Sequence, residues 1–125
     1  MSITFWAPEA PTRTETHHQE GYEAWTEEVS SLPEIKLSSS NALVMLEALG
    51  VKPDLCGAWS TDQLGEMLRR AADVANVPDR LERVGAAWSG IAPPGPVVDH
   101  IRRTALRFVD LFRQAQADGY KVCWG

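Results

Sequence analysis

The C-terminal part of the chain holds the pattern that most restricts its fold. Between Val97 and Ala117, apolar side chains recur at i, i+4, i+7, i+11 and i+14, which is the spacing of one buried face of an α-helix; they are Ile101, Ala105, Phe108, Phe112 and Ala115. Asp118-Gly119 ends the pattern, and apolar residues at 120, 122 and 124 then alternate with Lys121 and Cys123, as in a strand. A long helix that leads directly into a strand predicts a fold that mixes both.

Two further strands are predicted nearer the N-terminus. Ile3–Trp6 is a β-prone run that Ala7-Pro8 ends, and residues 34–38 place Ile35 and Leu37 on one face and Lys36 on the other. With 125 residues the chain fits one domain, residues 1–125. We therefore predict an α+β fold in which a small sheet of about three strands packs against three to four helices, with the terminal strand paired into the sheet.

The first predicted helix follows the second strand directly, in "LSSSNALVMLEALG". Ser39 or Ser40 is the expected N-cap, and Gly50 is expected to close the helix in the left-handed conformation. From Ala42 to Leu49 every residue except Glu47 is apolar, so this helix should be enclosed by the fold.

Two more helices are predicted before the long one. Ser60 and Gln63 have the spacing of a capping box, and an inward stripe follows until about Ala75, made of Leu64, Leu68, Ala71 and Ala75. Asp79 is the expected cap of a short helix whose apolar face is Leu81, Val84 and Trp88. The segment "SGIAPPGP", residues 89–96, should then interrupt all regular structure.

Residues 7–33 form an acidic segment that we expect to be rich in loops. Two patterns compete after Thr12: Tyr22, Trp25, Val29 and Leu32 have helical spacing, whereas "TRTETH" alternates like an edge strand. The net charge of −5 lies entirely within residues 1–36, where seven carboxylates face Arg13 and Lys36. An acidic chain repels phosphate backbones, so a nucleic-acid partner is disfavoured.

The sequence lacks two patterns, a long apolar run and a leader, which bear on membrane association and on the cellular compartment. The longest apolar run is far shorter than the ~20 residues of a membrane span, so no membrane partner is expected. The start has no basic and apolar leader, which predicts a cytoplasmic protein. Cys56 and Cys123 are then expected as reduced thiols, although a disulfide between them stays open if the compartment is oxidising.

The turn at 38–41 is the first candidate site. Amides at a helix N-terminus attract anions, and Ser39, Ser40 and Asn41, with Trp59, are candidate ligand-binding residues. A phosphate loop would need glycines and a lysine, which are missing here, so a plain helix cap is the competing interpretation.

No catalytic, metal or cofactor site is predicted. His17-His18 with Glu20 lacks the spacing of a metal site, because adjacent histidines point in different directions. Asp99-His100 and Cys56 could serve as a base and a nucleophile, but an ion-paired helix surface and a small buried side chain explain them as well.

The tryptophans and the arginines suggest interaction surfaces. Trp6, Trp25 and Trp88 lie near predicted loops or element ends, and such aromatic residues are common anchors of protein interfaces. Packing at the edge of the core is the competing interpretation. The last helix has a basic outer face, whose members are Arg102, Arg103, Arg107 and Arg113. This face is either solvated or paired within the molecule, or it binds an acidic protein partner or nucleic acid.

The order of a strand, "LSSSNALVMLEALG", "LCG", a leucine-bearing helix, a long helix and a terminal "VCWG" resembles a group of small uncharacterised proteins of bacteriophages and bacteria. The resemblance implies an accessory protein and no particular activity. Our hypothesis is a non-enzymatic protein that binds a protein partner or a second copy of itself. The alternative is a small-molecule or anion-binding protein, or a minor hydrolase, with its pocket at the 38–41 turn.

Overall fold

The structure is a computed structural model that describes residues 1–88 and 94–125, with the side chains of 94–96 outside the description. Four strands come first, and the helices follow, with one short strand after the first helix and one at the end. In chain order they are β1 (Ser2–Trp6), β2 (Thr12–His17), β3 (Trp25–Ser30), β4 (Ile35–Ser38), α1 (Ser39–Ala48), β5 (Gly57–Trp59), α2 (Thr61–Asn76), α3 (Pro78–Ala87), α4 (Pro94–Asp118) and β6 (Val122–Trp124).

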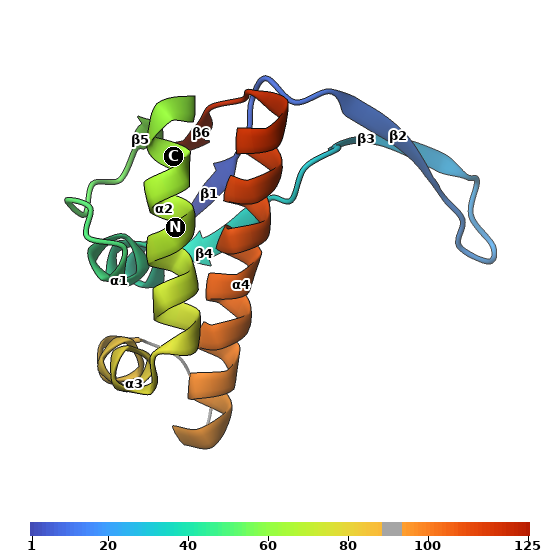
Figure 1. The fold of residues 1–125 in the computed structure, drawn as a ribbon. Helices are drawn as coiled ribbons and strands as arrows, with labels where there is room; N and C mark the ends of the chain where they lie inside the picture. Colours follow the sequence, from blue (N-terminus) through green and yellow to red (C-terminus); the bar gives the residue numbers. More distant parts are fainter. Residues whose placement is uncertain (89–93) are drawn as a thin grey trace.

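The predicted α+β fold is confirmed, with two antiparallel sheets (Figure 1). The larger sheet has the strand order β4-β1-β6-β5, so the last strand pairs with the first, as expected. It also contains β5, Gly57–Trp59, a strand that the sequence analysis does not predict. This three-residue strand is stabilised by its pairing with Val122–Trp124, and it is too short to show the apolar alternation of a strand.

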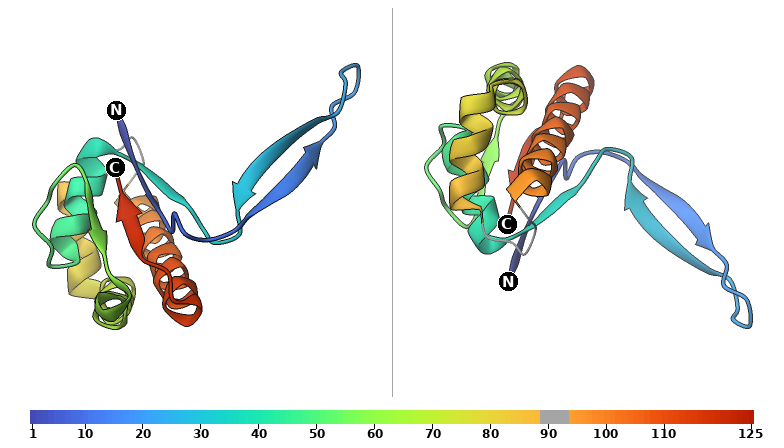
Figure 2. Two further views of the ribbon diagram at one scale, coloured as in Figure 1. Left: turned by 90° about the horizontal axis from the view of Figure 1, so that it is seen from above. Right: turned by 90° about the horizontal axis from the view of Figure 1, so that it is seen from below.

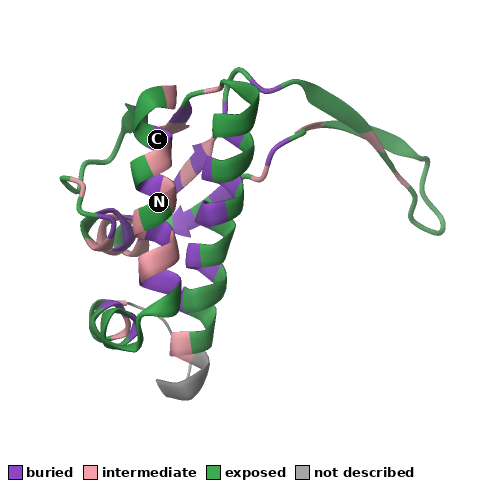
Figure 3. Ribbon diagram, in the orientation of Figure 1, coloured by how far each residue is buried: buried purple, intermediate pink, exposed green. Residues whose placement is uncertain are grey.

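One face of the larger sheet is buried and the other is not. The alternation puts seven large side chains on the buried face, namely Ile3, Phe5, Ile35, Leu37, Trp59, Val122 and Trp124. Helix α4 lies against them, because the ring of Phe108 meets Phe5 edge-on at 4.8 Å and Phe112 meets Trp59 at 5.2 Å. Figure 3 shows this buried layer between α4 and the strands. The stripe predicted for the long helix is therefore its core-facing side, and its five members are all buried.

Helix α1 begins one residue earlier than predicted. The N-cap is Ser38, whose hydroxyl accepts from the Asn41 amide at 3.3 Å, so neither Ser39 nor Ser40 has that role. Gly50 closes the helix as predicted, with φ of 74°. The helix is only partly enclosed, since its residues 42, 45 and 46 are buried and Glu47 is exposed.

The starts of the other helices also follow local chemistry. The Ser60 amide donates to the Gln63 side chain at 2.9 Å, which confirms the capping box of α2. Helix α3 begins at Pro78 with Val77 as its N-cap, so Asp79 lies in the first turn and does not cap. Helix α4 begins at Pro94, inside the predicted break, because a proline in the first turn removes no helical hydrogen bond. The rest of that break, residues 89–93, lies outside the described residues.

Residues 12–30 form a separate β-hairpin, which we call the arm. Strands β2 and β3 pair from Thr12↔Ser30 to His17↔Trp25, so the edge-strand interpretation of "TRTETH" is confirmed and the helical alternative is wrong. The helical spacing was accidental, because Tyr22 and Trp25 are exposed on the arm while Leu32 is buried in the body. Figures 1 and 2 show the arm extending away from the rest of the molecule. The remainder, residues 1–11 and 31–125, is the body.

Candidate interaction site

The arm exposes side chains on both of its faces. The register gives one charged and aromatic face, made of Arg13, Glu15, His17, Trp25, Glu27 and Val29. The other face is rich in threonine and consists of Thr12, Thr14, Thr16, Thr26, Glu28 and Ser30. At the outer end Tyr22 is 72% exposed and Trp25 is 46% exposed. The arm therefore has no buried core of its own (Figure 3).

Local side-chain contacts within the arm are few and lie on its charged and aromatic face. The ring of His17 stacks on that of Trp25, with centroids 5.4 Å apart and planes 22° from parallel. Arg13 donates to Glu15 at 2.9 Å, and His17 Nε2 lies 3.2 Å from a Glu27 oxygen. Glu15 and Glu27 are directly opposite each other across the ladder, an arrangement that destabilises a hairpin. With five glutamates against one arginine, the arm has a net charge of −4.

The body gives the arm little support. Neither β2 nor β3 packs extensively on a described helix or on the larger sheet, whereas β2 and β3 pack closely on each other. An isolated two-stranded hairpin is marginally stable in water. The arm is tied to the body mainly at its base, where the Ser31 amide donates to the Pro11 carbonyl at 2.9 Å and Leu32 is buried.

The three tryptophans proposed as interface residues lie in different parts of the molecule. Trp25 belongs to the arm, and Trp6 lies half-buried on the face of the larger sheet that the helices leave open. Trp88 follows α3 and meets the His100 ring at 5.9 Å. Within the described residues no ring contact joins any two of them, so the structure does not bring them together as one patch.

The residues proposed around the serine turn are also separated. Ser39 and its neighbours follow β4 at one edge of the larger sheet, whereas Trp59 is in β5 at the opposite edge. The Trp59 ring is buried against Phe112 and Trp124 and faces the core. The Ser39 hydroxyl oxygen is buried and makes no hydrogen bond to a described residue. The four residues thus do not line one pocket.

A groove that the sequence did not reveal lies between α1, α3 and the end of α2. Its volume is about 440 Å³. The floor is apolar, and Arg80, Arg83 and Glu47 are its charged members; the apolar lining residues are Val44, Ala48, Val74, Val84 and Ala87. Arg80 and Arg83 are exposed and three residues apart, so they lie on the same side of α3. The spacing of Arg80 and Arg83 is the one feature of the sequence that points to a basic side of this helix. Only the fold shows that α1 lies opposite them.

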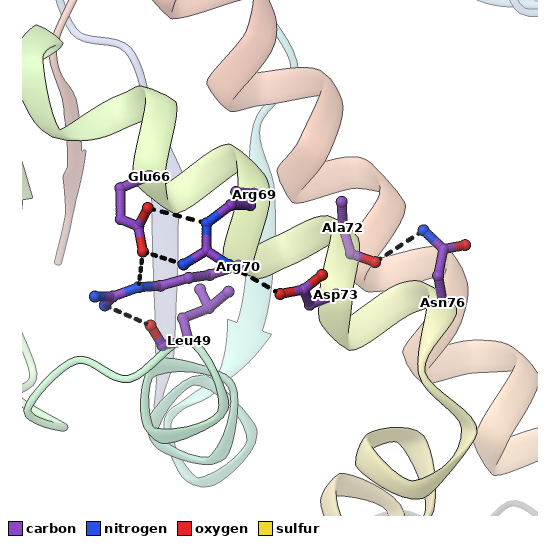
Figure 4. A network of polar contacts seen from close by, with 7 residues as sticks. All are labelled: Leu49, Glu66, Arg69, Arg70, Ala72, Asp73 and Asn76. Atoms are coloured by element: carbon purple, nitrogen blue, oxygen red, sulfur yellow. Dashed lines mark hydrogen bonds and ion pairs between the residues drawn. The ribbon is translucent and has the colours of Figure 1, made fainter.

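A second polar cluster joins α2 to the end of α1 (Figure 4). Glu66 accepts hydrogen bonds from Arg69 and Arg70, and Arg70 also donates to the Leu49 carbonyl at 3.1 Å. These bonds to two guanidinium groups lower the pKa of Glu66 to about 2. Arg70 thereby satisfies a carbonyl at the helix C-terminus, and we assign the cluster a structural role.

The arginines of α4 are largely engaged within the molecule. Arg102 donates to the Ala75 carbonyl at 3.3 Å, and Arg107 donates to the Glu34 carbonyl at 2.8 Å. Arg113 lies 3.9 Å from Asp110. These contacts agree with the paired interpretation of the basic face, although the acidic arm takes no part, because it points elsewhere (Figure 2).

The remaining candidates show no joint chemistry. Cys56 and Cys123 are both free thiols. Among residues 1–88 and 94–125 there is no group of three or more histidine, cysteine or carboxylate side chains that could hold a metal ion. Across the same ranges, none of the helices is long and apolar enough to cross a membrane.

Comparison with known proteins does not identify a relative of this chain. No protein-family model matches the chain, and neither a curated protein nor a solved structure was found to match it. The resemblance to the phage and bacterial group therefore stays a prediction.

Proposed function

We propose that this protein is a non-enzymatic interaction protein that binds a protein partner through its arm. The observation that carries the proposal is the exposure of the arm on both faces without support from the body. A hairpin of this kind is marginal alone, and contact with a partner would cover its strand edges and its exposed aromatic rings. A ribbon that serves only to connect β1 and β4 would not need 19 residues, because a short loop suffices.

The charge of the arm defines the kind of partner surface. A net charge of −4 on so small an element favours a surface rich in lysine and arginine, and it disfavours nucleic acid. Tyr22 and Trp25 supply the aromatic anchors that protein interfaces use. The resemblance in the serine-turn region supports an accessory role in the cytoplasm of a bacterium or a phage-infected cell.

Site-specific photo-crosslinking in the producing organism tests the proposal. A photoreactive phenylalanine analogue replaces Tyr22 at the arm tip, and in a matched variant it replaces Lys52, which is also exposed, on a loop of the body. We expect a protein adduct from position 22 and none from position 52. Mass spectrometry identifies whether the adduct is another protein or a second copy of this chain. If position 22 gives no protein adduct, the proposed function is wrong.

A second candidate is binding of a small molecule or anion, or minor hydrolysis, at the 38–41 turn. The buried and unpaired hydroxyl of Ser39 at the start of α1 supports it. A ligand that binds only the native state raises the melting temperature. A thermal-shift screen with inorganic phosphate, nucleotides and sugar phosphates should therefore show a rise that Ser39→Ala abolishes. No rise with any of these compounds would count against this candidate.

A further inference from the structure

The groove between α1 and α3 has the chemistry of a receptor for an acidic and aromatic segment. Its floor is made of small aliphatic side chains, which suit an aromatic ring. Arg80 and Arg83 lie along its α3 side, and neither makes an ion pair with a carboxylate of the described residues. Among the lining residues the two guanidinium groups face a single carboxylate, Glu47, so the groove carries a net positive charge.

The tip of the arm has the matching chemistry. We define the tip as residues 18–24, between β2 and β3. It carries Glu20 and Glu23 on either side of Tyr22, the most exposed aromatic residue of the described chain. Gly21, with φ of 85°, and a hydrogen bond of 3.0 Å from the Tyr22 amide to the Gln19 carbonyl form the turn that presents this ring. An acidic pair around an aromatic ring complements an arginine pair beside an apolar floor.

The tip cannot reach the groove of its own molecule. In Figures 1 and 2 the arm leaves the body on the side away from α1 and α3, and it points outward in every view. The six residues of each strand span about 20 Å at ~3.4 Å per residue, to which the tip adds a few more residues. This length is comparable with the width of a body whose radius of gyration is about 13 Å, so an arm can pass along a neighbouring molecule.

We propose that the groove binds the arm tip of a second copy of this chain, and that two copies exchange arms reciprocally in a closed dimer. Tyr22 lies on the apolar floor, and Glu20 and Glu23 pair with Arg80 and Arg83. The inference rests on the proposed function and names the partner of the arm. Closure by a two-fold axis uses both arms and both grooves, which leaves no open end for further growth.

Charge reversal tests this arrangement. The tip variant is Glu20→Arg with Glu23→Arg, and the groove variant is Arg80→Glu with Arg83→Glu; all four residues are exposed, so the core is not altered. Each variant alone places like charges at both contacts of a dimer, and we expect at least a tenfold weaker self-association. A mixture of the two variants has opposite charges at both contacts. The mixture should therefore form a heterodimer with an affinity near that of the unmodified protein.

Analytical ultracentrifugation over about 5–200 μM covers the range expected for a contact of this size. The matched control is Arg103→Glu with Arg113→Glu, which makes the same change of charge on α4 and should leave the dimer intact. A monomer at the highest concentration, or a dimer that neither variant weakens, overturns the inference, as does a mixture that stays monomeric. In each of these cases a crosslink from position 22 to a different protein would still support the proposed function.

Discussion

Gly57→Ala should be the most informative change in the sheet, because it introduces a single methyl group where the core has no room. An added Cβ at this position would lie 2.3, 2.5 and 2.9 Å from three ring carbons of Trp124. Carbon atoms in contact prefer a separation of about 3.5–4.0 Å, so the ring has to move by more than about 1 Å. The ring also packs against Trp59, at a centroid distance of 4.3 Å, which restricts its movement.

The cost follows from the contacts that the movement disturbs. Overpacking of a core costs about 1–3 kcal/mol. Displacement also stretches the hydrogen bond from Trp124 Nε1 to the Asp54 carbonyl, now 3.0 Å, which contributes about 0.5–1.5 kcal/mol. We therefore expect Gly57→Ala to lower the free energy of unfolding by about 2–4 kcal/mol, which is roughly 8–15 °C in Tm for a chain of this size.

The assay is urea unfolding followed by tryptophan fluorescence, together with a thermal scan. Gly85→Ala is the matched control, because its added Cβ would meet its nearest atoms at 3.7 and 3.8 Å, an ordinary contact, in the interior of α3. That change should raise the stability by about 0.5–1 kcal/mol, since alanine is the better helix former. A loss below about 1 kcal/mol for Gly57→Ala would refute the claim that the β5–β6 pairing brings the glycine under the Trp124 ring.

Three other predictions concern a helix cap, an ion cluster and the arm. Ser38→Ala should cost about 1 kcal/mol in urea unfolding, because the Asn41 amide loses its acceptor, whereas Ser39→Ala should be neutral or stabilising because that hydroxyl is buried and unpaired. The pKa of Glu66 is lowered from 4.5 to about 2, so its stabilising effect is present above about pH 4.5 and disappears as the pH falls towards 2. The difference in unfolding free energy between the protein and Glu66→Gln should therefore shrink over that interval. A constant difference would contradict the assignment. Replacement of residues 12–30 by a short turn should change the stability of the body by less than about 1 kcal/mol, because the arm adds little to the core and loop length has a small entropic cost; a larger loss in thermal unfolding would show that the arm supports the fold.

Elements whose signals are local could be predicted from the sequence. The stripe of α4 is repeated over four turns, and the capping box of α2 and Gly50 after α1 each satisfy backbone groups within a few residues. The terminal strand could be predicted because Tyr120, Val122 and Trp124 alternate directly after a helix end. In these places each helix face, cap or strand alternation is formed by residues close together in the sequence, so the local sequence predicts it.

Elements whose cause is distant could not be predicted. Strand β5 depends on Val122–Trp124, more than sixty positions away, and its glycine would count against a strand if taken alone. For residues 12–33 the sequence alone does not distinguish a helix from a hairpin. Leu32 would share an apolar face with Tyr22 in a helix, and only the fold shows that Leu32 is buried in the body while Tyr22 is exposed on the arm. The groove forms because α1 and α3 lie next to each other, and the sequence of neither helix predicts that neighbour. The candidate site was therefore predicted only in part, as exposed Trp25 on an acidic segment.

The uneven charge of the sequence gains a physical reason from the fold. Of the seven carboxylates in residues 1–36, five lie on the arm. On the arm most of these glutamates are exposed to water, so their charges do not have to be desolvated. Such a placement lowers the stability of the hairpin, since Glu15 faces Glu27, and it gains nothing for the core. Under the proposed function, this charge serves a contact outside the fold with a surface of opposite charge.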